Sequence, residues 1–409
     1  MKTNKTLSAL ALLFGLGISA QAVQDVFING STAFRPQVYN ALKDLNLTVA
    51  NSATSGGNTW TFNGTIADHT GGHLTIPGPA EIAVCVHCSF DGSVQGVNAA
   101  QNNVNQVYFQ SDGTTTVSHP DDLAFSDIQQ ASTIYNGIPI LHEIVAPDAT
   151  NVGEGVAVQP FLWAANCAAF DDGCSNINQN NIWNLFNQGF VTLNCFTGNA
   201  GDSNTPVVLT GRDNSSGTRI TSQQLGQWKT FKPIIQYTIN GNTTDPATLA
   251  AGFPWALAPA DSQGPHDSGY SSGGKVAHAL AYGNCTNGPA VSYLSFADAY
   301  SGLQYTGAAF LTYQGVPPQI GPTQTVSGAT TFDINAVING RYDDWSYEHL
   351  YSNANDSVSG VIVADIAPAL VSALEYEIGQ TSPQTAILIG NMNVNREGGD
   401  GIPLTQGNY

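Results

Sequence analysis

The sequence is poor in charge, and the charge that it has is mostly negative. Only 10% of the 409 residues are Asp, Glu, Lys or Arg, and 30 acidic residues stand against 11 basic ones, for a formal net charge of −19. A protein that binds nucleic acid usually carries the opposite sign and a basic patch, so we expect no nucleic-acid partner. A small anion is not disfavoured, because backbone N–H groups and one Arg can bind it inside an acidic protein.

Long apolar runs are missing beyond the first residues. Residues 1–22 have the pattern of a signal peptide, with a basic start, an apolar run over 7–18 and the small-x-small triplet Ala20-Gln21-Ala22. No later run approaches the roughly 18 to 20 residues that a membrane span needs. No cysteine lies near the cleavage position, so no lipid anchor is expected. We therefore expect a periplasmic or secreted protein whose mature chain starts near Val23.

Cysteine is scarce. An even number of cysteines in an oxidising compartment favours disulfides, although the sequence does not determine their pairing. Cys167 and Cys174 form the best local candidate pair. The segment Cys85 to Cys88, with His69 and His73 upstream, could instead bind a metal, but a second Cys pair at a comparable spacing is missing, so no metal site is predicted. The six cysteines are Cys85, Cys88, Cys167, Cys174, Cys195 and Cys285.

Catalytic motifs are missing too. The eight histidines are scattered, and the sequence contains no Gly-x-Ser-x-Gly elbow, no His-Glu-x-x-His and no Walker loop. The residues of a Ser-His-Asp triad need not be close in sequence, so the absence of these motifs does not exclude a triad. We expect neither catalytic activity nor a cofactor.

The most informative stretch that is present runs from Gly211 to Arg219. It follows the apolar run Pro206 to Leu209 and precedes Ile220 to Leu225, which predicts a strand, a tight loop and a helix N-terminus. Such a loop suits an anion, because the first N–H groups of a helix lack partners within it and carry partial positive charge. The alternative is an ordinary helix capped by Ser215 or Ser216.

Four residues of this stretch offer groups for an oxyanion. Ser216 and Thr218 carry hydroxyls, Gly217 lets a ligand approach the backbone, and Arg212 offers a planar fork of N–H donors. Because carboxylates are numerous in this chain, a structural ion pair is the competing role for Arg212.

A second stretch of this kind lies near the mature N-terminus. Phe27 to Pro36 predicts a strand, a loop containing Ser31, Thr32 and Ala33, and a helix start in which the proline costs no hydrogen bond. Ser31 or Thr32 is also a good cap for that helix.

Two more small-residue turns lie between these loops. Gly92 to Val97 contains Ser93, and Phe125 to Asp127 contains Ser126 and ends on a carboxylate. Each has an ordinary alternative: turn chemistry for Ser93, and a cap for a helix over 129–133 for Asp127.

The rest of the chain alternates strands with helices, and 42% of its residues are apolar, enough for a sizeable core. This predicts an α/β sheet with ligands beyond the carboxyl ends of its strands. Residues 51–80 are predicted to be an insertion, folded as a hairpin. Helical spacing is found over 38–45, 97–105, 177–186, 276–282 and 366–378. Strands are predicted over 26–28, 81–85, 106–110, 123–126, 138–145, 156–163, 207–209, 290–294 and 386–389.

The four loops, in this order, resemble those of the PstS-like periplasmic phosphate-binding proteins, which belong to the type 2 solute-binding superfamily. The matching motifs are that family's first anion loop, its Gly-Ser-x-x-Gly-Ile turn, its Ala-Ser-Asp segment and its Arg-x-x-x-Ser-Gly-Thr loop. Three further stretches resemble relatives of this branch: Gly269 to Leu280, Asn339 to Tyr351 and Met392 to Arg396.

This resemblance implies a two-lobed α/β fold with a ligand cleft between the lobes. Lobe 1 would comprise residues 23–128 and 295–409, and lobe 2 residues 129–294. The protein would capture a small oxyanion, most of all phosphate, for the membrane permease of an ABC-type transporter, and we expect a monomer. The ligand-binding residues would be Ser31, Thr32, Ala33, Ser93, Ser126, Asp127, Arg212, Ser216, Gly217 and Thr218.

Two of these residues have particular roles in the family. At the position of Asp127, a carboxylate accepts a hydrogen bond from protonated phosphate, and at the position of Arg212 a guanidinium pairs with the charge. Because an ionised carboxylate only accepts hydrogen bonds, it would repel fully ionised sulfate.

The chain also departs from the family. Its first loop lacks the aromatic residue directly after the Thr, and Asn214-Ser215 stands where Asp-Gly is common. Molybdate, sulfate or an organic molecule are therefore alternative ligands. The alternative function is that of a secreted surface or matrix protein that retains the binding fold without a transport role.

Overall fold

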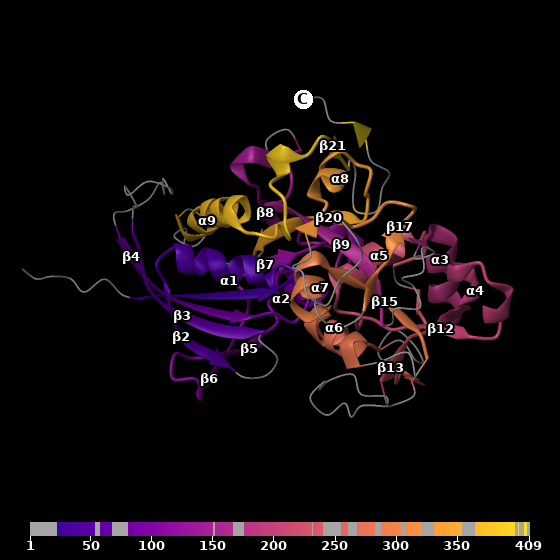
Figure 1. The fold of residues 1–409 in the computed structure, drawn as a ribbon. Helices are drawn as coiled ribbons and strands as arrows, with labels where there is room; N and C mark the ends of the chain where they lie inside the picture. Colours follow the sequence, from indigo (N-terminus) through magenta and orange to yellow (C-terminus); the bar gives the residue numbers. More distant parts are fainter. Residues whose placement is uncertain are drawn as a thin grey trace, which may run out of the picture.

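The computed structural model describes most of the chain (Figure 1). The predicted signal peptide, the Cys167–Cys174 pair and both His69 and His73 lie outside the described residues. The described residues are 23–53, 58–67, 81–149, 152–166, 176–230, 232–239, 255–260, 268–282, 288–303, 308–320, 331–353, 365–396, 400 and 405–406.

One mixed sheet of twelve strands forms the centre of the described structure. In order across it lie β11 (Phe190–Thr192), β12 (Pro206–Leu209), β15 (Ala290–Ser295), β9 (Ala157–Ala165), β20 (Trp345–Ser352), β7 (Leu123–Ser126), β1 (Gln24–Gly30), β4 (Glu81–Ser89), β3 (Thr59–Ala67) and β2 (Thr48–Ala53). In addition, β16 (Ala309–Phe310) pairs with β9, and β8 (His142–Ile144) pairs with β20.

Parallel pairing places the predicted anion loops at strand ends. β1 pairs in parallel with both β4 and β7, so the loops that follow Gly30, Ser89 and Ser126 leave the same edge of the sheet. The Arg212 loop follows β12, which pairs in parallel with β15. All four loops thus follow the carboxyl ends of strands, where ligands bind in open α/β sheets.

Two long strands join the two groups of strands. Residues 345–348 of β20 pair with β9, and residues 349–352 of the same strand pair with β7. In the same way, β9 pairs first with β20 and then with β15. Figure 1 shows β20 and β9 between the indigo strands of the N-terminal part and the magenta and orange strands β12 and β15.

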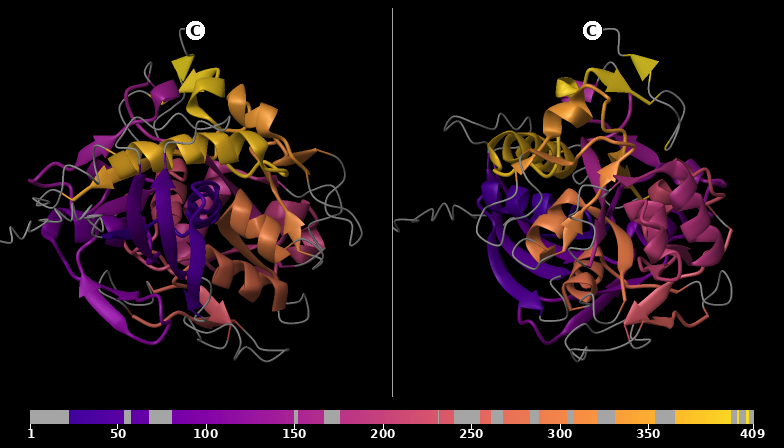
Figure 2. Two further views of the ribbon diagram at one scale, coloured as in Figure 1. Left: turned by 90° about the vertical axis from the view of Figure 1, so that its left-hand side faces the viewer. Right: turned by 45° about the vertical axis from the view of Figure 1, so that its right-hand side comes forward.

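Helices cover the sheet. α9 runs beside α1, far from it in sequence (Figure 1, Figure 2). Among the described residues, no helix has both the length and the apolar character that a bilayer crossing needs. The helices are α1 (Arg35–Asp44), α2 (Ser93–Asn102), α3 (Gln179–Gln188), α4 (Asn194–Thr197), α5 (Gly217–Leu225), α6 (Gly273–Tyr282), α7 (Phe296–Leu303), α8 (Ile334–Ile338) and α9 (Ala367–Gln380).

Short strand pairs and single turns of 3₁₀ helix complete the described structure. The pairs are β5 (Gln106–Phe109) with β6 (Thr116–His119), β10 (Asn176–Ile177) with β17 (Thr312–Tyr313), β13 (Tyr237–Ile239) with β14 (Trp255–Leu257), β18 (Gln319–Ile320) with β19 (Thr331–Phe332) and β21 (Val394–Asn395) with β22 (Thr405–Gln406). The 3₁₀ turns are Gln130–Ser132, Pro147–Ala149, Ala200–Asp202 and Ile389–Asn391.

The mixed α/β fold is confirmed, and four predicted elements need correction. The strand expected over 138–145 is limited to β8, residues 142–144. The helix expected over 97–105 begins four residues earlier, at Ser93, because the glycine before it supplies the positive φ of its entry. The strand expected over 386–389 is a single bridge from Ile387 to Val158, followed by a 3₁₀ turn. The hairpin predicted within 51–80 is formed by β2 and β3 over 48–53 and 59–67, and residues 68–80 lie outside the described residues. β3 pairs along its whole length with β4 and so belongs to the main sheet.

Candidate functional site, an anion site where four loops meet

Side chains of the four predicted loops touch one another. Arg212 Nη1 donates to Thr32 Oγ1 at 2.9 Å, and Thr218 Oγ1 donates to Asp127 Oδ2 at 2.9 Å. The Ser93 hydroxyl donates to the other carboxylate oxygen of Asp127. Segments that lie up to 180 positions apart in sequence thus share one buried site.

Arg212 is held by oxygen atoms of neutral groups. Its Nε donates to the carbonyl of Tyr270 at 3.0 Å, and its Nη2 donates to the carbonyl of Ser271 at 3.0 Å. Within the described part of the chain no carboxylate forms an ion pair with it, which excludes that alternative there. A guanidinium has five N–H donors, and the three bonds above leave two for a ligand.

Ser216 caps α5 and lies in the same site. Its Oγ accepts from the backbone N–H of Arg219 at 3.2 Å, as the capping interpretation predicted. The amides of Gly217 and Thr218, which precede Arg219 in this first turn, make no hydrogen bond within the described structure. Capping and anion binding are therefore compatible at this helix.

Gly217 lies directly against the carboxylate. A Cβ built on Gly217 would lie 2.0 Å from Asp127 Oδ1 and 2.6 Å from Ser93 Oγ. Both distances are far below a van der Waals contact. Only glycine fits here without displacing the site.

The loop before α2 approaches the Arg212 loop just as closely. Val94 N donates to the Ser215 carbonyl at 2.9 Å, and Ser215 Oγ donates to the Asp91 carbonyl at 3.0 Å. Gly92 has a φ of +113°, and a Cβ there would lie 2.5 Å from the same Ser215 oxygen. The backbone of the loop before α2 and the backbone of the Arg212 loop are thus in direct contact.

The loop between β1 and α1 has two backbone N–H groups without a hydrogen-bond acceptor among the described residues. Ser31 donates its N–H to the Phe125 carbonyl at 2.8 Å, and its Oγ accepts from Phe34 N at 3.2 Å. The amides of Thr32 and Ala33 make no hydrogen bond within the described residues. Phe34, which has no capping side chain, precedes α1, so the predicted cap by Ser31 or Thr32 is not formed in the usual way.

Asp127 does not cap a helix. The 3₁₀ turn Gln130–Ser132 follows it, with Gln129 at the N-cap position and no side-chain cap. Burial raises the pKa of Asp127 above its usual value, by more than the hydroxyls of Ser93 and Thr218 and the charge of Arg212 lower it. Its neighbour Ser126 uses its hydroxyl on its own chain, donating to the Ile128 carbonyl at 2.6 Å.

One acidic residue of the site was not predicted. Glu348 comes from β20 and is completely buried, with the Ser31 hydroxyl close to its carboxyl group. Burial and then the nearby Asp127 carboxyl raise the pKa of Glu348 well above its usual value. The protonated form of the Glu348 carboxyl group, which has an O–H to donate, is therefore favoured relative to that of an exposed glutamate.

A second arginine, Arg35 at the start of α1, was also not predicted. Its Nη2 lies 3.2 Å from Asp298 Oδ1, and the Ser295 hydroxyl donates to the same carboxylate at 2.9 Å. Burial, and to a lesser extent the charge of Arg212, lowers the pKa of Arg35. The two guanidiniums thus belong to one electropositive region with Asp298 as counterion.

The site is closed to solvent. The side chains of Thr32, Ser93, Asp127, Arg212 and Thr218 are each at most 3% exposed. Charged groups buried to this degree need partners, and the contacts above supply them.

The disulfide prediction is not supported where the structure describes cysteines. Cys85, Cys88 and Cys195 are free thiols. Cys85 and Cys88 are three positions apart on β4 and so face opposite sides of the sheet, which prevents a bond between them.

Comparison with known proteins gives structural similarity only. No family model matches the chain, and no curated protein matches its sequence. The structure is similar to a putative phosphate ABC transporter substrate-binding protein with bound phosphate from Clostridium perfringens, with 11% identity and a TM-score of 0.47 over 90% of this chain and 100% of that one.

Two further solved structures are of the same kind. One is an ABC-type phosphate transport receptor from Vibrio cholerae, with 12% identity and a TM-score of 0.45 over 89% of this chain and 99% of that one. The other is PstS from Borrelia burgdorferi, with 12% identity and a TM-score of 0.40 over 89% and 98%.

Proposed function

We propose that the protein is an exported solute-binding protein that captures a small tetrahedral oxyanion, with phosphate as its ligand, for an ABC-type membrane permease. The observation that supports this most directly is the meeting of Thr32, Ser93, Asp127 and Thr218 around Arg212. Two unused guanidinium donors and the amides of two helix starts favour an anion at this place.

The ligand would be recognised by its protons as well as by its charge. Asp127 would accept a hydrogen bond from monohydrogen phosphate, and a neutral Glu348 would donate one to a phosphate oxygen. Sulfate has no proton to give to Asp127 and would leave that carboxylate unpaired beside an anion. The pair of acidic residues thus favours phosphate over sulfate.

Lobe 1 of the proposed protein comprises residues 23–128 and 295–409, and lobe 2 residues 129–294. Arg212 of lobe 2 and Thr32 of lobe 1 would then bind the anion from opposite sides. Because the side chains of Arg212 and Thr32 are buried, the ligand can enter only when the lobes separate along β9 and β20. Ligand binding would then favour the closed form, which a permease would recognise.

We propose a monomer without catalytic activity. A secreted surface or matrix protein is the second candidate, and it would keep the fold without binding an oxyanion. An enzyme would release product from phosphoesters during incubation.

Isothermal titration with phosphate, sulfate and molybdate distinguishes these functions. We expect tight binding of phosphate at one site per chain and much weaker binding of sulfate. Tight binding of molybdate or sulfate instead would keep the transport role and change the ligand. No binding of any of the three would leave the surface-protein function.

A further inference from the structure

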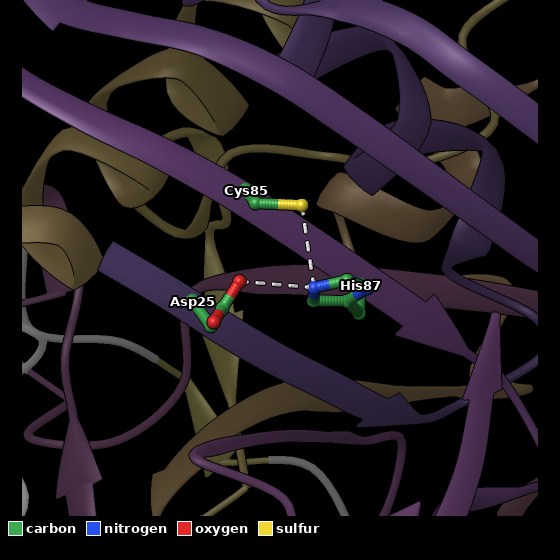
Figure 3. Close-up of side chains that lie close together, drawn as sticks. All are labelled: Asp25, Cys85 and His87. Atoms are coloured by element: carbon green, nitrogen blue, oxygen red, sulfur yellow. Dashed lines mark hydrogen bonds and ion pairs between the residues drawn. The ribbon is translucent and has the colours of Figure 1, made fainter. Parts of the chain in front are cut away.

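Three side chains with metal-binding atoms converge at the other end of β1. Asp25 lies directly opposite Cys85 in the parallel register of β1 and β4, and His87 is two positions further along β4, on the same face as Cys85. Figure 3 shows the three side chains pointing toward one another from the two strands. Their sulfur, nitrogen and oxygen atoms all lie within 4.8 Å of one another.

The imidazole of His87 is oriented by a backbone carbonyl. His87 Nδ1 lies 2.9 Å from the carbonyl oxygen of Phe109, which only accepts, so we assign the proton to Nδ1. The ring also stacks on Phe27, with centroids 4.9 Å apart and planes at 14°. Nε2 is thereby aimed at Cys85 and Asp25. Histidine ligands of metals are commonly held in this way, by a carbonyl on the other ring nitrogen.

The spacing of the three groups suits a tetrahedral ion. His87 Nε2 lies 3.2 Å from Cys85 Sγ and 3.3 Å from Asp25 Oδ1. Around zinc, with bonds of about 2.3 Å to sulfur and about 2.0 to 2.1 Å to nitrogen or oxygen, tetrahedral ligands lie about 3.3 to 3.6 Å apart. The third pair, Cys85 Sγ and the Asp25 carboxylate, lies within 4.8 Å, so an ion would have to draw these two groups no more than about 1.2 Å closer.

We propose that Asp25, Cys85 and His87 bind one zinc-like divalent ion, with its fourth position open to solvent. Cysteine and histidine select borderline and soft metals rather than magnesium or calcium. The Asp25 side chain is 62% exposed, whereas Cys85 and His87 are buried, so an ion reaches the site from the Asp25 side and can keep a water there.

This metal site is separate from the anion site. Asp25 stands at the start of β1 and Gly30 at its end, and five residues of extended strand span roughly 16 Å. Loss of one site is therefore not expected to remove the other. Burial and the Asp25 carboxylate raise the pKa of the Cys85 thiol to about 11, so binding would displace a thiol proton at neutral pH.

Cobalt absorption and zinc titration of the purified, reduced chain test the proposal. We expect one zinc ion with high affinity per chain and, with Co²⁺, a thiolate-to-cobalt charge-transfer band. Cys85→Ser should abolish the band, and His87→Ala and Asp25→Asn should weaken zinc binding by at least about 10-fold. The exposed thiol variant Cys195→Ser is the matched control and should keep both.

Phosphate titration of each variant serves as the folding control, since Cys85→Ser that still binds phosphate is folded. Absence of zinc binding by the wild-type chain would overturn the proposal and leave a thiol–imidazole–carboxylate hydrogen-bond chain. A charge-transfer band that persists in Cys85→Ser would also overturn the proposal, because the cobalt ion would then be bound by other cysteines.

Discussion

Thr218 donates a 2.9 Å hydrogen bond to Asp127 across 91 positions of sequence. This bond ties the N-terminus of α5 to the end of β7, and with it the Arg212 loop to the loop that carries the proposed specificity residue. Because of this bond, a small change in either segment should disturb the proposed anion site.

Gly217→Ala tests how tightly these two segments must approach. The new methyl group would lie 2.0 Å from Asp127 Oδ1, so α5 or the carboxylate must move. We expect a loss of stability of about 1 to 3 kcal/mol and a loss of phosphate binding, measured by urea unfolding and by titration. Gly379→Ala is the control, because nothing lies within 4 Å of a Cβ there and alanine should stabilise α9 by about 0.4 to 1 kcal/mol. Equal effects of the two substitutions would contradict the proposed close packing.

Asp127→Asn tests selectivity. An amide can donate to an anion that has no proton, so the variant should lose affinity for phosphate and gain affinity for sulfate. Competition titrations with both anions measure the ratio. If the preference for phosphate over sulfate stays unchanged, Asp127 does not accept a hydrogen bond from the protonated ligand.

The local chemistry of the loops was predictable from sequence, whereas their long-range partners were not. Hydroxyls and glycines indicated four loops at strand ends, and the structure brings these loops together, while their role in binding stays a prediction. The carbonyls of Tyr270 and Ser271, which hold Arg212, carry no signal in the sequence, because any residue has a carbonyl.

Glu348 was missed for another reason. Eight consecutive buried residues form β20, yet polar and aromatic side chains interrupt the apolar pattern that would have indicated a strand. Acidic residues are expected at the surface, so nothing in the sequence indicated that this one is buried beside Asp127. Its position next to Tyr347 and close to Trp345 and Tyr351 is the one signal that could have drawn attention to it.

Stability should depend on pH through Asp344. Its carboxyl oxygens have no hydrogen-bond partner within the described structure, and burial raises the pKa of Asp344 to about 8. Since the unfolded carboxyl has a pKa of about 3.9, the unfolded chain releases this proton first, and the contribution to stability falls by about 1.4 kcal/mol per pH unit between those values. Asp344→Asn should remove that slope, as measured by urea unfolding from pH 5 to 7.5.

The contribution of Asp112 to stability depends on pH in the opposite direction, so Asp112 serves as the control. Hydrogen bonds from Thr115 and Thr114 lower the pKa of Asp112 to about 2, so its contribution is present above pH 4 and is lost as the pH falls toward 2. Between pH 5 and 7.5 the Asp112→Asn curve should run parallel to wild type. A parallel curve for Asp344→Asn as well would mean that Asp344 is ionised in the folded protein.

Thiol labelling tests the free cysteines. Cys195 is exposed, whereas Cys88 is fully buried and burial raises the pKa of its thiol. A maleimide should therefore label Cys195 in the native protein and Cys88 only after unfolding, as peptide mass spectrometry would show. Native Cys88 labelled as fast as Cys195 would contradict the packing of β4.

Equilibrium dialysis with labelled phosphate tests the central claim most directly, using the wild-type chain, Arg212→Ala and Arg341→Ala. Arg341 pairs with Asp333 at the surface, and its side chain is 61% exposed, so its removal matches the charge change without touching the site. The account predicts one bound phosphate in the wild-type chain and in Arg341→Ala, and at least a 100-fold weaker affinity in Arg212→Ala, or about 2.7 kcal/mol. Phosphate bound equally well by Arg212→Ala, or not bound by the wild-type chain, would contradict it.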